Sequence, residues 1–193
     1  MYVVFEGIDG VGKSTQIELL RPIYPDAIFT LEPGGTALGR HLRELLLDKP
    51  YALDKRTEFF LFLSDRARHY EEVLRPNQNR RIISDRSCIS GMAYAKEFEL
   101  ETLFFFNQFA LDGFFPQKVV FLKADAALIQ TRLHHKRLDS IERLGVEHFL
   151  AVQDKLEKVL NFLKKQIFIK ILSLDAGEDR DLLSKKIKDF IDD

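Results

Sequence analysis

Short apolar runs alternate along the chain with longer segments in which apolar residues recur every three or four positions. A short run rich in β-branched and aromatic residues is typical of a buried strand, and helical spacing of apolar residues is typical of an amphipathic helix. Five strands are predicted on this basis, at residues 2–6, 27–32, 80–85, 118–123 and 167–175. Seven helices are predicted, at residues 13–24, 36–47, 54–74, 90–111, 126–134, 142–165 and 179–191. This alternation predicts an α/β fold in which helices cover both faces of a five-stranded parallel sheet.

Length and composition narrow the prediction to one domain. The chain has 193 residues, of which 46% are hydrophobic, so residues 1–193 suffice for one domain with a sizeable core. The net charge of -1 gives no general attraction to nucleic acid or to an anionic membrane. The N-terminal apolar run is too short for a signal peptide or a membrane span, and the single cysteine, Cys88, fits a reducing compartment. We expect a cytoplasmic protein without nucleic-acid or membrane partners.

A phosphate-binding motif follows the first predicted strand. Gly7, Gly12, Lys13 and Ser14 satisfy the spacing GxxxxGK[ST] between a strand and a helix, which is the context that a P-loop requires. Bare backbone N–H groups and the helix N-terminus can surround a phosphate chain there. Lys13 is expected to reach the β- and γ-phosphates of ATP, and Ser14 to bind Mg²⁺. The residues predicted to bind the nucleotide phosphates are Gly7, Gly10, Gly12, Lys13, Ser14 and Thr15.

Charged groups also follow the other strands, at the sheet edge where open parallel sheets bind ligands. Asp9 lies in the P-loop itself, LEPGGT occupies residues 31–36, and SDRS occupies residues 84–87. Asp85 could hold Mg²⁺ through water, while the guanidinium of Arg86 could grip an acceptor phosphate. A plain salt bridge at a strand end is the simpler alternative for this pair.

Phe62 and Arg66 lie four residues apart on a predicted helix and therefore share a face. An aromatic ring that can stack, beside a guanidinium that can donate hydrogen bonds, suits the binding of a planar nucleotide base. Because residues 59–63 are apolar on all sides, core packing or a subunit interface is an equally ordinary role for Phe62.

Four motifs in this order, FEGIDGVGKST, LEPGGT, FLSDRA and SDRSCISGMAY, resemble those of the thymidylate kinase family over nearly the whole chain. The resemblance implies a P-loop NTPase fold, a homodimer packed through helices, and the Mg²⁺-dependent reaction ATP + dTMP → ADP + dTDP. It also implies roles for individual residues. On the acceptor side Phe62 would stack on thymine, Arg66 would bind its carbonyl edge, Arg86 would bind the phosphate, and the pocket would be completed by Asp9, Pro33, Arg43, Ser90 and Tyr94. Asp175 and Ala176 would lie against adenine.

The resemblance further implies a basic lid at about residues 132–143, in which Arg137 would close over the transferring phosphate. A solvated basic helix end is the plainer interpretation of this cluster. The acceptor phosphate is already an anion, so positive charge matters more for this reaction than a general base. The predicted catalytic residues are the basic Lys13, Arg86 and Arg137, together with Asp9 of the P-loop.

Two other functions stay open at this point. A deoxynucleoside kinase would need a carboxylate base near the end of the second strand, where Glu32 stands. A non-catalytic ATP-dependent switch is less favoured, because the sequence has no NKxD motif and no DxxG motif after a strand that could serve as a GTPase switch.

Overall fold

The computed structural model describes residues 1–48, 52–95, 97–134 and 145–193. Within them the strands form one sheet in the order β2-β3-β1-β4-β5, and every neighbouring pair is parallel. The strands are β1 (Tyr2–Glu6), β2 (Ile28–Leu31), β3 (Ile82–Asp85), β4 (Lys118–Lys123) and β5 (Lys170–Asp175). The predicted five-stranded parallel sheet is confirmed.

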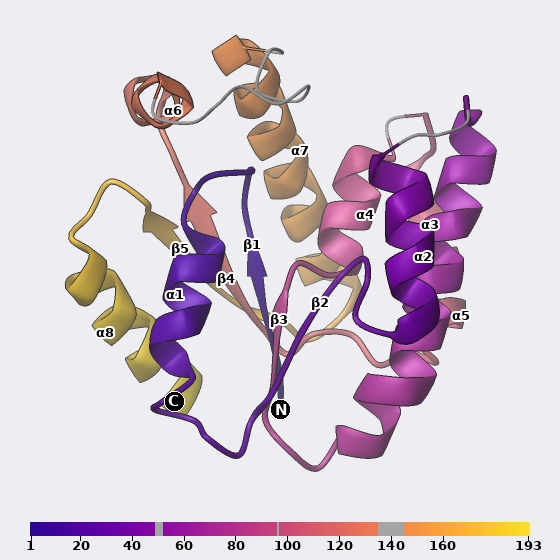
Figure 1. Cartoon of the computed structure of the whole chain (residues 1–193), viewed down its shortest axis with the longest axis horizontal. Coiled ribbons are helices and arrows are strands. Elements are labelled where there is room, and N and C mark those ends of the chain that lie inside the picture. The colour runs from indigo at the N-terminus through magenta and orange to yellow at the C-terminus, as the bar shows by residue number, and fades with distance from the viewer. Residues whose placement is uncertain (49–51, 96, 135–144) are drawn as a thin grey trace.

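Helices cover both faces of this sheet, as the sequence predicts. The α-helices in the described residues are α1 (Lys13–Leu20), α2 (Ala37–Leu47), α3 (Lys55–His69), α4 (Cys88–Tyr94), α5 (Leu100–Ala110), α6 (Ala126–His134), α7 (Gly145–Gln166) and α8 (Arg180–Asp192). A π-helical turn (Tyr70–Leu74) and a short 3₁₀ helix (Arg75–Asn77) continue α3. Helices α1 and α8 lie on one side of the sheet, and α3, α4, α5 and α7 lie on the other (Figure 1). None of the helices in the described residues combines the length and apolarity needed to cross a membrane.

Two predicted helices differ from the structure in ways that have a clear cause. Helix α1 ends at Leu20 and not at residue 24, because Pro22 follows and disfavours a further turn. The segment predicted as one helix over 90–111 is two helices, α4 and α5, so that prediction is wrong. The break lets Phe98 pack on the core, with its ring 5.3 Å from that of Phe59. Tertiary packing overrides local helix propensity there.

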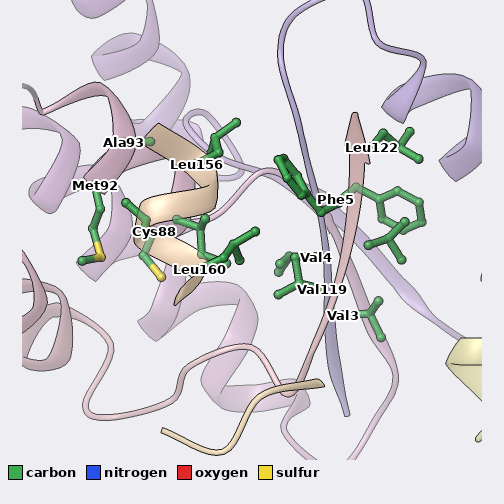
Figure 2. Packing of buried hydrophobic residues seen from close by; sticks show 14 of the residues in the cluster. Val3, Val4, Phe5, Cys88, Met92, Ala93, Val119, Leu122, Leu156 and Leu160 are labelled. Atoms are coloured by element: carbon green, nitrogen blue, oxygen red, sulfur yellow. The ribbon is translucent and has the colours of Figure 1, made fainter. Parts of the chain in front are cut away.

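The core lies where β1 and β4 meet the helices. Every side chain of β1 is buried, as expected for a central parallel strand covered on both faces. Figure 2 shows Cys88 and Met92 of α4 beside Leu156 and Leu160 of α7. Because parallel strands all end at one edge, this core fixes Glu6, Asp85 and the segments after β2 and β5 at a common edge.

Candidate active site

The loop between β1 and α1 has a backbone that glycine makes possible. Gly7, Gly10 and Gly12 have φ values of 146°, 75° and 101°, in the region that side chains disfavour. A Cβ atom on Gly7 would lie 2.5 Å from the carbonyl oxygen of Leu122 on β4. The backbone of β4 is therefore in close contact with the loop, and only glycine fits at this position.

Lys13 begins α1 and points back into this loop. Its Nζ donates to the carbonyl oxygens of Gly7 and Ile8, at 3.1 and 2.8 Å, and the side chain is buried. Burial, and then the nearby charge of Arg86, lower the pKa of Lys13 to about 8. A phosphate chain in the loop would replace these carbonyl partners and would favour the charged form.

Ser14 and Asp85 bring two oxygen-bearing side chains together beside the loop. The hydroxyl of Ser14 donates to Oδ2 of Asp85 at 2.7 Å. The other carboxylate oxygen, Oδ1, is buried and has no hydrogen-bond partner in the described residues. A buried carboxylate oxygen without a partner is costly unless a cation or another ligand reaches it. Oxygen donors of this kind suit a hard divalent cation. Thr15, which is predicted to bind the nucleotide phosphates, is exposed next to Ser14.

The metal would need further ligands from a bound nucleotide. No cluster of three or more His, Cys, Asp or Glu side chains suited to a metal occurs in the described residues. Magnesium sites that use one or two protein ligands together with substrate phosphates fit this arrangement.

Arg86 lies across the loop from Lys13, directly after β3. Its backbone has φ 68°, held by its N–H bond to the carbonyl of Phe5 at 2.9 Å. Its guanidinium donates to Ser90 Oγ at 2.8 Å and to Asp9 Oδ1 at 2.5 Å. Burial acts against the charge of Arg86, but the negative groups around it, Asp9 first, raise its pKa overall. An uncommon backbone conformation thus aims a permanent cation at the P-loop.

Tyr94 lies beside this cation, with its ring centroid 5.7 Å from Cζ of Arg86. Burial raises the pKa of Tyr94 to about 12, so the phenol is neutral near pH 7. The structure therefore brings four of the predicted acceptor residues together: Asp9, Arg86, Ser90 and Tyr94.

Sequence reasoning missed Glu6, which is hydrogen-bonded to Ser90 of this group. Glu6 is fully buried and accepts hydrogen bonds from the hydroxyls of Ser87 and Ser90, at 2.7 and 2.5 Å. Burial raises the pKa of Glu6, although Arg86 partly offsets the effect. An acidic residue at the end of an otherwise apolar strand is the signal that could have indicated it.

Residues 32–36 form a loop after β2, which we call the acceptor loop. The carbonyl of Pro33 accepts from Arg43 of α2 at 2.8 Å, so the structure joins two predicted site residues. On the other side, the N–H of Gly34 donates to Asp65 of α3 at 3.1 Å. Burial, and then the charge of Glu32, raise the pKa of Asp65 to about 6.

Arg66 and Phe62 differ in exposure although they share a face of α3. Phe62 is half-buried, whereas Arg66 is only 2% exposed. Arg66 donates from Nε to Glu32 at 2.9 Å and from Nη1 to Asn107 of α5 at 2.8 Å. Two edges of its guanidinium therefore bind protein. Its Nη2 faces Gly91 of α4, where a Cβ atom would lie 2.6 Å away.

Glu32 is fully engaged in the same network. Its Oε2 accepts from Arg66 and its Oε1 pairs with His69 Nδ1, both at 2.9 Å, and its side chain is 3% exposed. Burial would raise the pKa of Glu32, but Arg66 and His69 lower it. A buried, doubly paired carboxylate cannot reach a substrate hydroxyl, which removes the proposed base of a deoxynucleoside kinase.

The turn after β5 approaches the P-loop through Arg132. The N–H of Ala176 donates to the carbonyl of Lys123 at 2.7 Å, and Asp175 accepts from the N–H of Gly177 at 2.8 Å. Arg132 of α6 donates to the carbonyls of Gly10 and Ala176, at 3.0 and 2.9 Å. Sequence reasoning assigned Arg132 to the lid and did not single it out. Arg137, the preferred lid residue, lies outside the described residues.

Known proteins resemble this chain in sequence and in structure. The thymidylate kinase family model matches residues 5–187. A thymidylate kinase of Campylobacter jejuni subsp. jejuni is 66% identical over 191 residues, which cover 99% of this chain and 100% of that protein. That of Campylobacter lari is 55% identical over 194 residues, with both chains fully covered. The crystal structure of thymidylate kinase from Ehrlichia chaffeensis matches with a TM-score of 0.73 at 22% identity, covering 100% of this chain and 98% of that one.

Proposed function

Because this chain belongs to the thymidylate kinase family, we propose that its P-loop holds ATP while Arg86 and the acceptor loop hold dTMP for direct phosphoryl transfer. The enzyme transfers the γ-phosphoryl group of ATP to dTMP and forms dTDP and ADP, a step in dTTP synthesis. The observation that supports separate donor and acceptor sides is the contact of Arg86, the proposed acceptor clamp, with Asp9 of the P-loop.

The chemistry of this reaction places most of the demand on positive charge. An acceptor phosphate oxygen is already anionic and can attack the γ-phosphorus without a general base, but two polyanions must be brought together. In this proposal Lys13, which bonds to carbonyl oxygens of the loop, binds the donor phosphates, and Arg86, directly after β3, binds the acceptor phosphate. Arg137 is proposed to add positive charge from the lid.

In this proposal each remaining site residue has one role. Ser14 and Asp85 hold Mg²⁺, supported by the unpaired buried oxygen of Asp85, and the metal neutralises charge on the donor phosphates when it is bound. The other proposed contacts are Gly7, Gly10, Gly12 and Thr15 with the phosphates, Asp175 and Ala176 with adenine, Phe62 and Arg66 with thymine, Asp9, Ser90 and Tyr94 with the nucleotide sugar and phosphate, and Pro33 and Arg43 with the acceptor through its loop.

We also propose that the enzyme is a homodimer. Phe60, Phe105 and Phe109 expose 47%, 64% and 84% of their surface on α3 and α5, which contact each other in the fold. Exposed aromatic residues on neighbouring helices are a common feature of subunit interfaces. Replacing Phe109 with Lys should convert a dimer into monomers in sedimentation velocity, while an unchanged mass would exclude this face as the interface.

The broader predictions from the sequence are unchanged. We propose a single P-loop kinase domain over residues 1–193 with a lid at about 132–143, located in the cytoplasm and acting without nucleic acid or membrane.

The decisive assay measures ADP release from Mg-ATP with dTMP, thymidine, dUMP and UMP offered separately, and identifies the products by mass. ADP and dTDP formed chiefly with dTMP are the expected result. Formation of dTMP from thymidine would contradict the inaccessible position of Glu32, and ATP consumption without any acceptor product would contradict kinase function.

A further inference from the structure

Helix α3 holds the acceptor loop through three side chains that lie within little more than one helical turn. Asp65 accepts from the N–H of Gly34, while Arg66 and His69 both bind Glu32, the first residue of the loop. All three side chains are nearly inaccessible to solvent. The position of the loop is therefore coupled to α3 by buried, charged hydrogen bonds, which are directional and strong.

His69 is the innermost member of this group. It is 0% exposed, and it lies between Glu32 Oε1, 2.9 Å from Nδ1, and Thr30 Oγ1, 2.7 Å from Nε2. An ionised carboxylate only accepts hydrogen bonds, so Nδ1 must carry a proton and donate to Glu32. In the neutral ring Nε2 then accepts from the hydroxyl of Thr30 on β2. The ring thus fixes the carboxylate relative to the sheet.

The same ring also supports the middle of the acceptor loop. A Cβ atom on Gly35 would lie 2.8 Å from Cδ2 of His69 and 2.8 Å from Oγ1 of Thr30. The backbone of Gly35 consequently rests on the edge of the imidazole, with no room for a side chain between them. His69 therefore contacts the loop twice, at Glu32 through a hydrogen bond and at Gly35 through packing.

We propose that His69 is a positioning residue for dTMP, because it fixes the acceptor loop directly and orients Arg66 through their shared partner Glu32. The ring of His69 hydrogen-bonds to Glu32 and to Thr30, and neither partner belongs to the P-loop. Its loss should therefore weaken the acceptor more than the donor. This inference rests on the proposed placement of dTMP beside the acceptor loop and Arg66.

Two substitutions separate the contacts of the ring. Asparagine places its amide nitrogen near the position of Nδ1 and its oxygen near that of Cδ2, so His69→Asn keeps a donor to Glu32 and an atom beneath Gly35. Glutamine reaches toward the position of Nε2, so His69→Gln keeps a partner for Thr30 and loses the donor to Glu32. His41→Gln on α2 is the matched control, because His41 is exposed.

The test is steady-state kinetics with each substrate varied in turn. In His69→Gln we expect KM for dTMP to rise about tenfold and KM for ATP to stay within about twofold, as for a lost acceptor-specific interaction. His69→Asn should recover most of the dTMP affinity, and His41→Gln should behave as wild type. Equal rises in both KM values, or a His69→Asn enzyme as impaired as His69→Gln, would overturn the proposal.

Two further variants keep the test decisive. If His69→Gln does not fold, His69→Asn and Thr30→Val carry the test, since both lose only the contact at Nε2. Both should raise KM for dTMP by the same small factor and leave KM for ATP unchanged, and equal rises in both KM values would overturn the proposal. Arg66→Lys separates this inference from the proposed function. A normal KM for dTMP in Arg66→Lys would remove Arg66 from the acceptor site, whereas a raised value there with a normal value in His69→Gln would reject only the positioning role.

Discussion

Glu6 and Glu32 lie at the carboxyl ends of β1 and β2, and both side chains are buried, yet burial has opposite outcomes for them. The pKa of Glu6 is raised because its direct partners are the hydroxyls of Ser87 and Ser90. The pKa of Glu32 is lowered because Arg66 and His69 compensate its burial. The direct partner of a buried carboxylate, more than its depth, decides which form is favoured.

This difference matches the role that we propose for each region. The hydroxyl of Ser90 lies between Glu6 and Arg86, so Arg86 keeps its charge for the phosphate that it is proposed to bind, and its side chain remains 15% exposed. In the other region Arg66 binds Glu32 directly, and its side chain is only 3% exposed. A cation that must meet an incoming anion cannot be consumed by a buried carboxylate, whereas one that reads a neutral base can be fixed in advance.

The largest expected effect separates the two glutamates by stability. Glu32→Gln leaves the guanidinium of Arg66 buried without its counter-charge, which should lower the free energy of unfolding by about 3–5 kcal/mol. Glu6→Gln keeps an acceptor for the serine hydroxyls and removes a desolvated charge, so it should change stability by less than about 1 kcal/mol. Urea unfolding at pH 7 measures both, and equal losses would refute the contrast.

The second effect concerns the two arginines in catalysis. Arg86→Ala should reduce kcat/KM for dTMP by about 10²–10³-fold, because it removes positive charge where we propose that the acceptor phosphate binds, while KM for ATP changes little. Arg80→Ala is the control, since Arg80 is exposed and precedes the N-terminal end of β3, at the opposite edge of the sheet from Arg86. Parallel losses for ATP and dTMP would contradict the acceptor role of Arg86.

Sequence patterns predicted the parts of this site that are encoded locally. The P-loop glycines and the spacing of the strands predicted a common sheet edge, because a short motif and the period of a strand are both local properties. The break between α4 and α5 was missed, because it depends on Phe98 meeting Phe59 39 residues earlier in the chain.

The buried hydrogen-bond networks could not be predicted from local sequence patterns either, because they also join residues that are distant in the sequence. Glu32 and His69 are separated by 37 residues, and Arg66 and Asn107 by 41, so no local spacing relates them. The sequence predicted a fork on Arg66 that faces thymine beside Phe62. The structure shows that two edges of this fork are already occupied, and its role toward thymine stays a prediction.

A third prediction tests how firmly Arg66 is fixed. Alanine is normally better than glycine within a helix by about 1 kcal/mol, and Gly91 lies inside α4. Here the new Cβ would lie 2.6 Å from Nη2 of Arg66, which Glu32 and Asn107 hold in place. Gly91→Ala should therefore destabilise the protein by about 1–3 kcal/mol.

The double variant Gly91→Ala, Glu32→Gln provides the check on this explanation. Once Glu32 no longer holds Arg66, the guanidinium can move away, and adding Gly91→Ala should become neutral or stabilising. Additive losses in urea unfolding would mean that the crowding at Gly91 does not depend on a fixed arginine.

The smallest effect is the pH dependence that the two carboxylates impose on stability. For Glu6 the folded pKa lies above the ordinary 4.5, so the folded state binds more protons than the unfolded state in the range between them, and stability should fall as pH rises through that range. For Glu32 the folded pKa lies below 4.5, so its contribution is complete above pH 4.5 and is lost as pH falls toward the folded value. Each slope is limited to about 1.4 kcal/mol per pH unit.

Comparing the wild type with Glu6→Gln by urea unfolding at several pH values above 4.5 should show the variant gaining relative stability as pH rises. A difference independent of pH would mean that Glu6 titrates as it does in the unfolded chain, and that its partners compensate its burial completely.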